Sequence, residues 1–282
     1  MIDAVRRFLI EGLDIRGAVV RLGPAWREMQ ARRDYGEPER DLLGELAAVT
    51  ALIGSNLKQA GRITFQLQGH GPVRMLFVDC DEQLRMRGMA RTDDFISAAP
   101  PAELFGDGQL VLNLQTGAAQ PYQSIVPLEG ATLAEIFEHY LAQSEQTPTR
   151  LWLAADAQTA CGLFLQKLPG ADDADPDGWN RMQQLAATAR SEELALPAET
   201  LLARLFAEET LRLFEPLPVV YHCPRDEEKV LNMLRTLGRE EVAEMLAEHD
   251  EIVIQDEVCN HEYRFGKDVL AQLFPTPSQL RH

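Results

Sequence analysis

The sequence predicts an α+β protein, because a run of strands and separate runs of helices follow one another along the chain. Strands are indicated where apolar and polar residues alternate between short turns. RITFQLQ and VRMLFVDC are two such segments, and GHGP is the turn between them. Helices are indicated where apolar residues recur every three or four positions. A third observation is a change of character after Pro216 and Pro218, where two short charged helices split by Gly238 follow.

The elements of the larger, N-terminal part follow from these two periodicities. Residues 18–22 make a strand, and residues 39–61 form a buried helix that Gly61 ends. The later elements are antiparallel strands at 62–68, 73–80, 84–91, 109–115 and 122–128, an amphipathic helix at 133–148 ended by Pro148, a strand pair within 149–170, and helices at about 178–190 and 198–212.

The C-terminal part predicts two short helices separated by Gly238, a hairpin made of EIVIQ and EYRF, and a final short helix. The first helix has one apolar face, formed by Val230, Met233, Leu234 and Leu237. The chain is therefore expected to contain an antiparallel-sheet core domain with packed helices, a helical linker and a small helical and hairpin module, at residues 1–175, 176–219 and 220–282.

The composition limits the classes of partner. The formal charge is −17, from 44 acidic and 27 basic residues. This balance argues against nucleic acid and anionic membranes, because both attract clustered Lys and Arg. The sequence lacks a signal-peptide pattern and any run of roughly 20 apolar residues, and its four cysteines are too few for a secreted disulfide framework. We expect a soluble cytoplasmic protein.

No enzyme motif is found in the sequence. The GHGP stretch lacks the third glycine and the helix of a nucleotide-binding loop, and there is no GxSxG or GxxxxGK(S/T) pattern. His70 and His139 have no catalytic partner at a recognisable spacing. Cys80 and Cys161 fall within strand-like runs, where a single cysteine is usually a small buried apolar residue. We expect no catalytic residues.

Two further cysteines flank the predicted helices of the C-terminal module. Cys223 lies in YHCPRDEEKV and Cys259 in QDEVCNHEYRF, each with histidine nearby. Zinc takes about four ligands, and the candidates here are Cys223, Cys259, His261, Asp256 and His222. His222 and Cys223 are neighbours, and neighbours in an extended strand face opposite ways. The residues alone leave open a metal site, the remnant of one, or two unrelated cysteines.

The core contains, in order, the segments LLGELAAVTALI, ITFQLQGHGPV, YQSIVPLEG, YLAQSEQTPT and LFLQKLPG. These resemble the heat-shock protein 33 family of redox-regulated bacterial holdase chaperones. The C-terminal segments CPRDEEKVLNMLRTLGREEVAEML and CNHEYRF also resemble the zinc module of that family. The resemblance spans nearly the whole chain.

The resemblance implies an α+β core, a metastable helical linker and a C-terminal module in which four cysteines, as CxC and CxxC, bind zinc when reduced. Oxidation in that family forms a disulfide within each pair, releases zinc and unfolds the linker. The exposed apolar surface then holds unfolding proteins without ATP. The resemblance thus implies unfolded client proteins as partners, a homodimer, and zinc as the cofactor.

This chain departs from the family pattern at two ligand positions. Tyr221 stands where the first cysteine of CxC should be, and Asp256 stands at the first position of CxxC. Each half retains one thiol, that of Cys223 or Cys259. In the family's shape these two thiols would face each other under ~4 Å apart. A disulfide closing the 35 intervening residues would then constrain the unfolded chain by roughly 3–4 kcal/mol.

Three hypotheses of function follow. The first is an ATP-independent holdase without the four-cysteine zinc switch, tuned by one disulfide or by no redox chemistry. The second is a divergent zinc-binding redox chaperone whose ligands are Cys223, Cys259, His261 and either Asp256 or His222. The third is a small-molecule enzyme built on the same core, which no catalytic constellation supports.

Client binding is expected in the linker. Its LLARLFAEETLRLF stretch carries the apolar candidates Leu202, Leu205, Phe206, Leu211 and Phe214 in a mixed charged setting. Contiguous apolar patches are what non-native proteins bind. The alternative is an amphipathic helix packed on the core in the resting state, and in a switchable holdase the two arrangements hold at different times.

Overall fold

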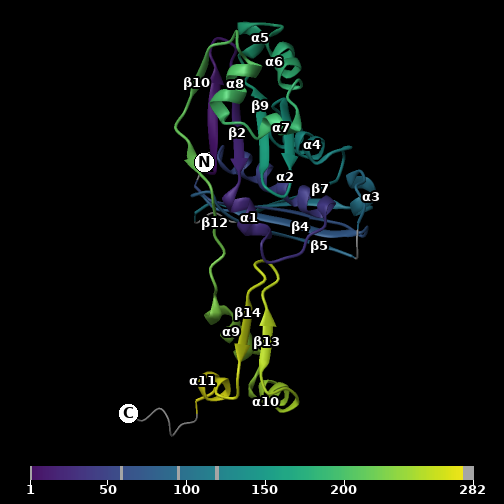
Figure 1. Cartoon of the computed structure of the whole chain (residues 1–282), viewed down its shortest axis with the longest axis vertical. Coiled ribbons are helices and arrows are strands. Elements are labelled where there is room, and N and C mark those ends of the chain that lie inside the picture. The colour runs from purple at the N-terminus through teal and green to yellow at the C-terminus, as the bar shows by residue number, and fades with distance from the viewer. Residues whose placement is uncertain (1, 58–59, 94–95, 118–120, 276–282) are drawn as a thin grey trace. The chain divides into compact units, whose positions relative to one another are not determined.

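Two sheets form the framework of the first of two structural units (Figure 1). The computed structural model describes residues 2–57, 60–93, 96–117 and 121–275. The chain divides into a core unit, Met1–His222, and a C-terminal unit, Cys223–His282.

In the core unit, sheet A has the strand order β10-β1-β2-β9-β8, with β11 also paired to β1. Sheet B has the order β12-β5-β4-β3-β6-β7. Pairing is antiparallel except between β12 and β5. The strands are β1 (Ala4–Ile10), β2 (Ile15–Leu22), β3 (Arg62–Gln68), β4 (Val73–Cys80), β5 (Arg85–Thr92), β6 (Gln109–Gln115), β7 (Tyr122–Pro127), β8 (Thr149–Ala155), β9 (Ala160–Lys167), β10 (Leu211–Leu213), β11 (Leu217–Pro218) and β12 (Val220–Tyr221).

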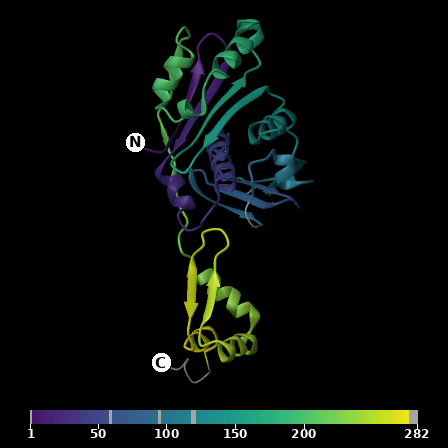
Figure 2. The same cartoon turned by 45° about the vertical axis from the view of Figure 1, so that its right-hand side comes forward.

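A long helix, α2 (Glu37–Gly54), lies between the two sheets, as Figure 2 shows. Leu46, Val49 and Leu52 are fully buried, and they belong to one apolar cluster with residues of both sheets. A helix that is apolar on most sides can be covered on most sides, which explains its central place. Glycine at position 44 permits the close approach to β8, since a Cβ there would lie 2.5 Å from that of Ala155.

The end of α2 corrects the predicted helix over 39–61. The helix stops at Gly54 rather than at Gly61. Ser55 Oγ and Asn56 Nδ2 each donate a hydrogen bond of 2.8 Å to Leu52 O, so polar side chains satisfy a carbonyl of the last turn. Residues 58 and 59 of the predicted helix lie outside the described residues.

The remaining helices of the core unit are shorter than α2. Those packed on sheet A include α6, α7 and α8, which cover the face opposite α2. The bounds are α1 (Pro24–Gln30), α3 (Pro101–Phe105), α4 (Leu133–Glu145), α5 (Ala171–Ala174), α6 (Gly178–Ala186), α7 (Ser191–Leu194) and α8 (Ala198–Leu205).

The segment 176–219 contains strands as well as helices. The predicted helix over 198–212 is wrong beyond Leu205, where α8 ends. The chain then pairs with the free edge of β1: Glu11 N donates to Thr210 O at 2.8 Å, and β10 and β11 add to the sheet. Backbone hydrogen bonds to an edge strand, which no local pattern reveals, therefore override the helical spacing.

The C-terminal unit is built from α9 (Glu227–Leu237), α10 (Arg239–Glu248), the hairpin β13 (Ile252–Gln255) and β14 (Glu262–Phe265), and α11 (Val269–Leu273). Its apolar cluster includes Leu231, Leu234 and Tyr263. The predicted apolar face of the first helix is wrong in part, because Met233 and Leu237 are exposed. The break at Gly238, which has φ of 96°, is confirmed.

The strands predicted from period-two alternation are confirmed for β3 to β7 of sheet B, together with the strand pair β8–β9 and the C-terminal hairpin, whereas β12 of sheet B was not predicted. The sequence pattern does not predict β1 or α1. Trp26 of α1 is fully buried, and its Nε1 donates to Asp156 O at 2.7 Å. Within the described residues, no helix combines the length and the apolar character needed to cross a membrane.

A candidate redox and metal site in the C-terminal unit

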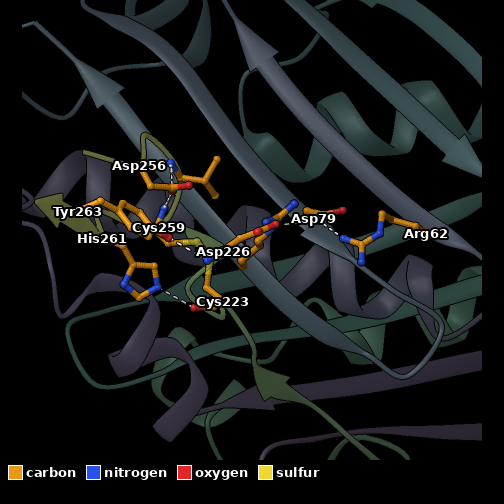
Figure 3. The surroundings of a disulfide bond; sticks show 10 residues. Arg62, Asp79, Cys223, Asp226, Asp256, Cys259, His261 and Tyr263 are labelled. Atoms are coloured by element: carbon orange, nitrogen blue, oxygen red, sulfur yellow. Dashed lines mark hydrogen bonds and ion pairs between the residues drawn. A yellow bond between two sulfur atoms is a disulfide. The ribbon is translucent and has the colours of Figure 1, made fainter. Parts of the chain in front are cut away.

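A disulfide joins Cys223 to Cys259 in the C-terminal unit (Figure 3). The two cysteines are 36 positions apart, and their Cα atoms are separated by 6.1 Å. Cys223 precedes α9, and Cys259 lies in the loop between β13 and β14. The closed loop therefore contains α9, α10 and β13.

The loop that carries Cys259 is closed by its own hydrogen bonds. Asp256 Oδ1 accepts from Val258 N at 2.9 Å and from Cys259 N at 2.6 Å. Asp256 N donates to His261 O at 2.8 Å, and Asn260 takes the left-handed backbone with φ of 55°. Asp256 thus acts as the acceptor that shapes the turn and positions Cys259.

His261 lies beside the two sulfur atoms. It is 7% exposed, and its Nε2 is 2.8 Å from Cys223 O. Because a carbonyl oxygen only accepts, Nε2 carries the proton in this contact, and Nδ1 holds the lone pair of the neutral ring. One ligand atom from each of Cys223, Cys259 and His261 lies within 4.8 Å of the others. This is a compact set of two thiolates and one imidazole once the disulfide is reduced.

The other ligand candidates, Asp256 and His222, lie outside that set, as does Tyr221, which marks a lost ligand. Asp256 is in the same loop, but its Oδ1 already serves the turn. Tyr221 belongs to β12 in the core unit, where it pairs with Met86 and packs against the apolar cluster around α2. His222 N donates to Met86 O at 2.8 Å in the same unit.

The donor set does not fit a closed four-thiolate zinc site. Such a site needs four protein ligands in a tetrahedron, and only three residues of the described chain gather here. Two thiolates and one imidazole do match zinc sites that keep one open position. The Nε2 contact with a backbone carbonyl is also the usual support of a histidine that ligates through its other nitrogen.

The remaining cysteines are of a different kind. Cys80 and Cys161 are free thiols, fully buried on β4 and β9, as the strand-like runs predict. Burial raises the pKa of Cys80 to about 12 and that of Cys161 to about 11. The thiolate is the reactive form of cysteine, so these two residues are protected from oxidants in the folded protein.

Sequence reasoning missed the residues that hold the start of the unit beside its hairpin. Asp226 Oδ1 accepts from Lys229 N at 3.0 Å and caps α9, while Asp226 N donates to Tyr263 Oη at 2.9 Å. The Arg225 guanidinium lies 4.7 Å from the centre of the Tyr263 ring. Aspartate three residues before a helical N–H is a readable cap signal, but the contact with Tyr263 has no local signal.

Comparison with known proteins places this geometry in a family. The family model described as "Hsp33 protein" matches residues 3–266. The chain belongs to the Hsp33 family. A 33 kDa chaperonin from Methylobacillus flagellatus is 42% identical over 97% of this chain and 95% of its own length. Proteins of the same name are 41% identical in Nitrosococcus oceani, over 96% and 94% of the two chains, and 40% identical in Pseudomonas aeruginosa, over 99% of both.

The fold agrees with this membership in the Hsp33 family. A crystal structure of the 33 kDa chaperonin (heat shock protein 33 homologue) of Thermotoga maritima matches with a TM-score of 0.82 and 22% identity. The match covers 96% of this chain and 97% of that chain. At this identity it shows the α+β fold alone.

Proposed function

We propose that this protein is an ATP-independent holdase that binds unfolded proteins without the family's four-cysteine zinc switch, and that one disulfide, Cys223–Cys259, stabilises its C-terminal unit in place of zinc. Membership in the Hsp33 family supports the chaperone function. The observation that carries the altered switch is the disulfide between the two halves of the C-terminal unit. The proposal excludes catalysis, and it assigns a core domain to 1–175, a linker to 176–219 and a redox module to 220–282, whose compact part is the C-terminal unit Cys223–His282.

The disulfide can only stabilise the C-terminal unit. Closing a loop of this length removes conformations from the unfolded chain and stabilises the folded unit by roughly 3–4 kcal/mol. Two disulfides within separate pairs cannot form here, because each half holds one thiol. Oxidation therefore stabilises this unit, and reduction weakens it.

The linker residues that we propose as client contacts are covered in this structure. Leu202, Leu205 and Phe206 are buried in the apolar cluster on the outer face of sheet A, Leu211 is half-buried, and Phe214 is 42% exposed. These residues become available to clients when the linker leaves the sheet, which also uncovers the sheet face beneath. Such a contiguous apolar surface is what unfolded chains bind.

The partners in this proposal are unfolded client proteins, and the protein acts as a cytoplasmic homodimer during oxidative or heat stress. The net charge of −17 disfavours nucleic acid and anionic membranes as partners.

An aggregation assay with a thermally unfolding client tests the holdase function. We expect stoichiometric amounts of the protein to suppress light scattering without ATP, in both the reduced and the oxidised state and in the Cys223→Ser variant. Absence of suppression in every state contradicts the chaperone function. Sharp activation only after peroxide treatment contradicts the loss of the switch, because it shows that activity still depends on thiol oxidation.

A second candidate is a zinc-binding redox chaperone. The cluster of Cys223, Cys259 and His261 favours it, with His261 Nδ1 and the two thiolates as ligands in the reduced protein. Zinc bound there would cross-link the unit without a disulfide. Metal analysis after purification under reducing conditions decides the matter: about one zinc per chain, lost in His261→Ala, supports this candidate, and a content near zero removes it.

A further inference from the structure

The edges of the two sheets are protected to very different degrees. Along β8, the edge of sheet A, Leu151 N donates to Glu138 Oε1 at 2.7 Å, and Arg150 pairs with the other oxygen of Glu138 at 2.6 Å. Helix α4, which carries Glu138, packs against this strand. At the other edges, β10 has three residues and β12 has two. Short strands, covering helices and charges are the devices that keep sheet edges from pairing with other chains.

Strand β7 has almost none of these devices. It is the edge of sheet B, and among the described residues it pairs with β6 alone. Its sequence, YQSIVP, carries no charge, and only Pro127 at its end lacks an N–H. The side-chain hydrogen bond of the strand runs to β6, from Gln123 Nε2 to Asn113 Oδ1 at 3.0 Å. Backbone groups on the outer side of an antiparallel edge strand have no partner in the sheet and remain available to another strand.

The side chains of β7 favour an apolar neighbour on either face. Tyr122 is 54% exposed and Ile125 is 55% exposed. Positions 122 and 125 point to opposite faces, because side chains alternate along a strand. The register agrees, since Tyr122 lies opposite Leu114 and Ile125 opposite Val111. An added strand would therefore meet a large apolar side chain on each side of the sheet.

We propose that the β7 edge binds extended segments of unfolded polypeptides by adding them as a further strand to sheet B. This inference rests on the proposed holdase function and gives it a binding site apart from the linker. Main-chain hydrogen bonds supply affinity that does not depend on sequence, and the uncharged, apolar-flanked edge accepts segments of either charge.

A second copy of this chain is a poorer occupant of the edge. A homodimer of chains that each carry a net charge of −17 needs a larger interface than one strand edge. Two strands of six residues also bury far less than the roughly 1,200 Å² of a stable interface. A holdase needs weak, repeated contacts with many segments, and one short edge supplies a contact of that strength.

Substitution of Ile125→Lys tests the edge, with Val253→Lys as the matched control. Lysine at an exposed edge position opposes strand addition without entering the core. Val253 is also an exposed β-branched strand residue, at 47%, but it lies on β13 in the C-terminal unit. Binding is measured by fluorescence anisotropy of labelled, reduced and carboxymethylated α-lactalbumin, in both redox states. We expect Ile125→Lys to raise the Kd for the unfolded client by about tenfold and Val253→Lys to raise it by less than about twofold. Equal effects of the two variants overturn the inference.

Hydrogen exchange gives a readout that is specific to strand addition. We expect amides of residues 122–127 to exchange more slowly when the unfolded client is added, while those of β8 stay unchanged. Unchanged exchange along β7 overturns the inference even if Ile125→Lys binds more weakly.

Sedimentation of the wild type and Ile125→Lys tests the other occupant. Loss of a dimer in the variant, with client binding retained, assigns the edge to a second copy and overturns the inference. A wild-type protein that binds no unfolded chain contradicts the holdase function itself, whereas a wild type that binds as well as Ile125→Lys contradicts only the edge.

Discussion

The core unit and the C-terminal unit are stabilised by different means. The core unit buries two large apolar clusters around its two sheets, and its two cysteines are free thiols inside them. The C-terminal unit has one small cluster and joins its two cysteines in a disulfide. Small units bury a smaller fraction of their surface, so a covalent cross-link contributes a larger share of their stability.

This difference shows how one residue type serves two roles within a chain. Burial raises the pKa values of the core thiols and keeps them unreactive. In the C-terminal unit, the two cysteines form a disulfide, and the redox state of the solution decides whether that bond is present. Redox conditions should therefore change the stability of one unit and leave the other unaltered.

The largest expected effect is in the core unit. Phe65 is fully buried, with its ring packed edge-on against Phe137 at a centroid distance of 4.8 Å. We expect Phe65→Ala to lower the free energy of unfolding of this unit by about 3–5 kcal/mol. Tryptophan fluorescence during denaturant unfolding reports on this unit alone, because Trp26, Trp152 and Trp179 all lie in it. An equal loss of stability in the C-terminal unit, measured by amide exchange, would contradict the separate stabilisation of the two units.

The disulfide should give the next largest effect, confined to the other unit. Reduction should lower the free energy of unfolding of the C-terminal unit by roughly 3 kcal/mol, because the closed loop is released. Amide exchange in α9 and α10 with and without a phosphine reductant measures this change. In Cys223→Ser the reductant should have no further effect, and a change in tryptophan fluorescence on reduction would contradict the separation of the units.

A half-buried carboxylate in α2 makes the stability of the core unit depend on pH. Burial, with a smaller contribution from the charge of Asp41, raises the pKa of Glu45 in α2 from 4.5 to about 7. The folded core unit therefore retains a proton that the unfolded chain releases, so its stability falls as the pH rises from about 4.5 through 7. We expect Glu45→Gln to raise the free energy of unfolding of the core unit by about 2 kcal/mol at pH 8.5 and to change it little at pH 4.5. Urea titrations at both pH values provide the measurement, and an equal gain at the two would assign the effect to packing.

The smallest expected effect concerns the turn beside the disulfide. Asp256→Ala removes the acceptor of two backbone N–H groups and should lower the stability of the C-terminal unit by about 1 kcal/mol. Asp256→Asn retains Oδ1 and should cost less than half of this. The midpoint of the C-terminal transition in urea measures both variants, and equal losses would indicate that the charge, rather than the acceptor, matters.

The local patterns of the sequence were sufficient for most of sheet B. In β3, apolar and polar residues alternate because one face packs on α2 and the other does not, so the order of residues follows the burial. The end of α2 was misplaced because two side-chain hydrogen bonds to Leu52 O, not a glycine, close its last turn.

The candidate site was predictable only in part. Resemblance of the C-terminal segments to the family pairs Cys223 with Cys259 and marks Tyr221 and Asp256 as departures. The proximity of His261 to both sulfur atoms depends on the hairpin loop, whose closure by Asp256 and Asn260 is a three-dimensional feature. His222 and Cys223, although adjacent in sequence, fall in different units.

Three features can be read from the residues alone: the strand periodicities of the core, the helix break at Gly238 and the loss of two cysteines from the family pattern. Tertiary structure decided that residues 211–213 pair with β1 instead of extending α8, and that β7 lies at an open edge of sheet B. The physical reason is the range of the interactions. Burial on one face repeats with a local period, whereas a backbone hydrogen bond to a distant strand depends on which edge the fold leaves within reach.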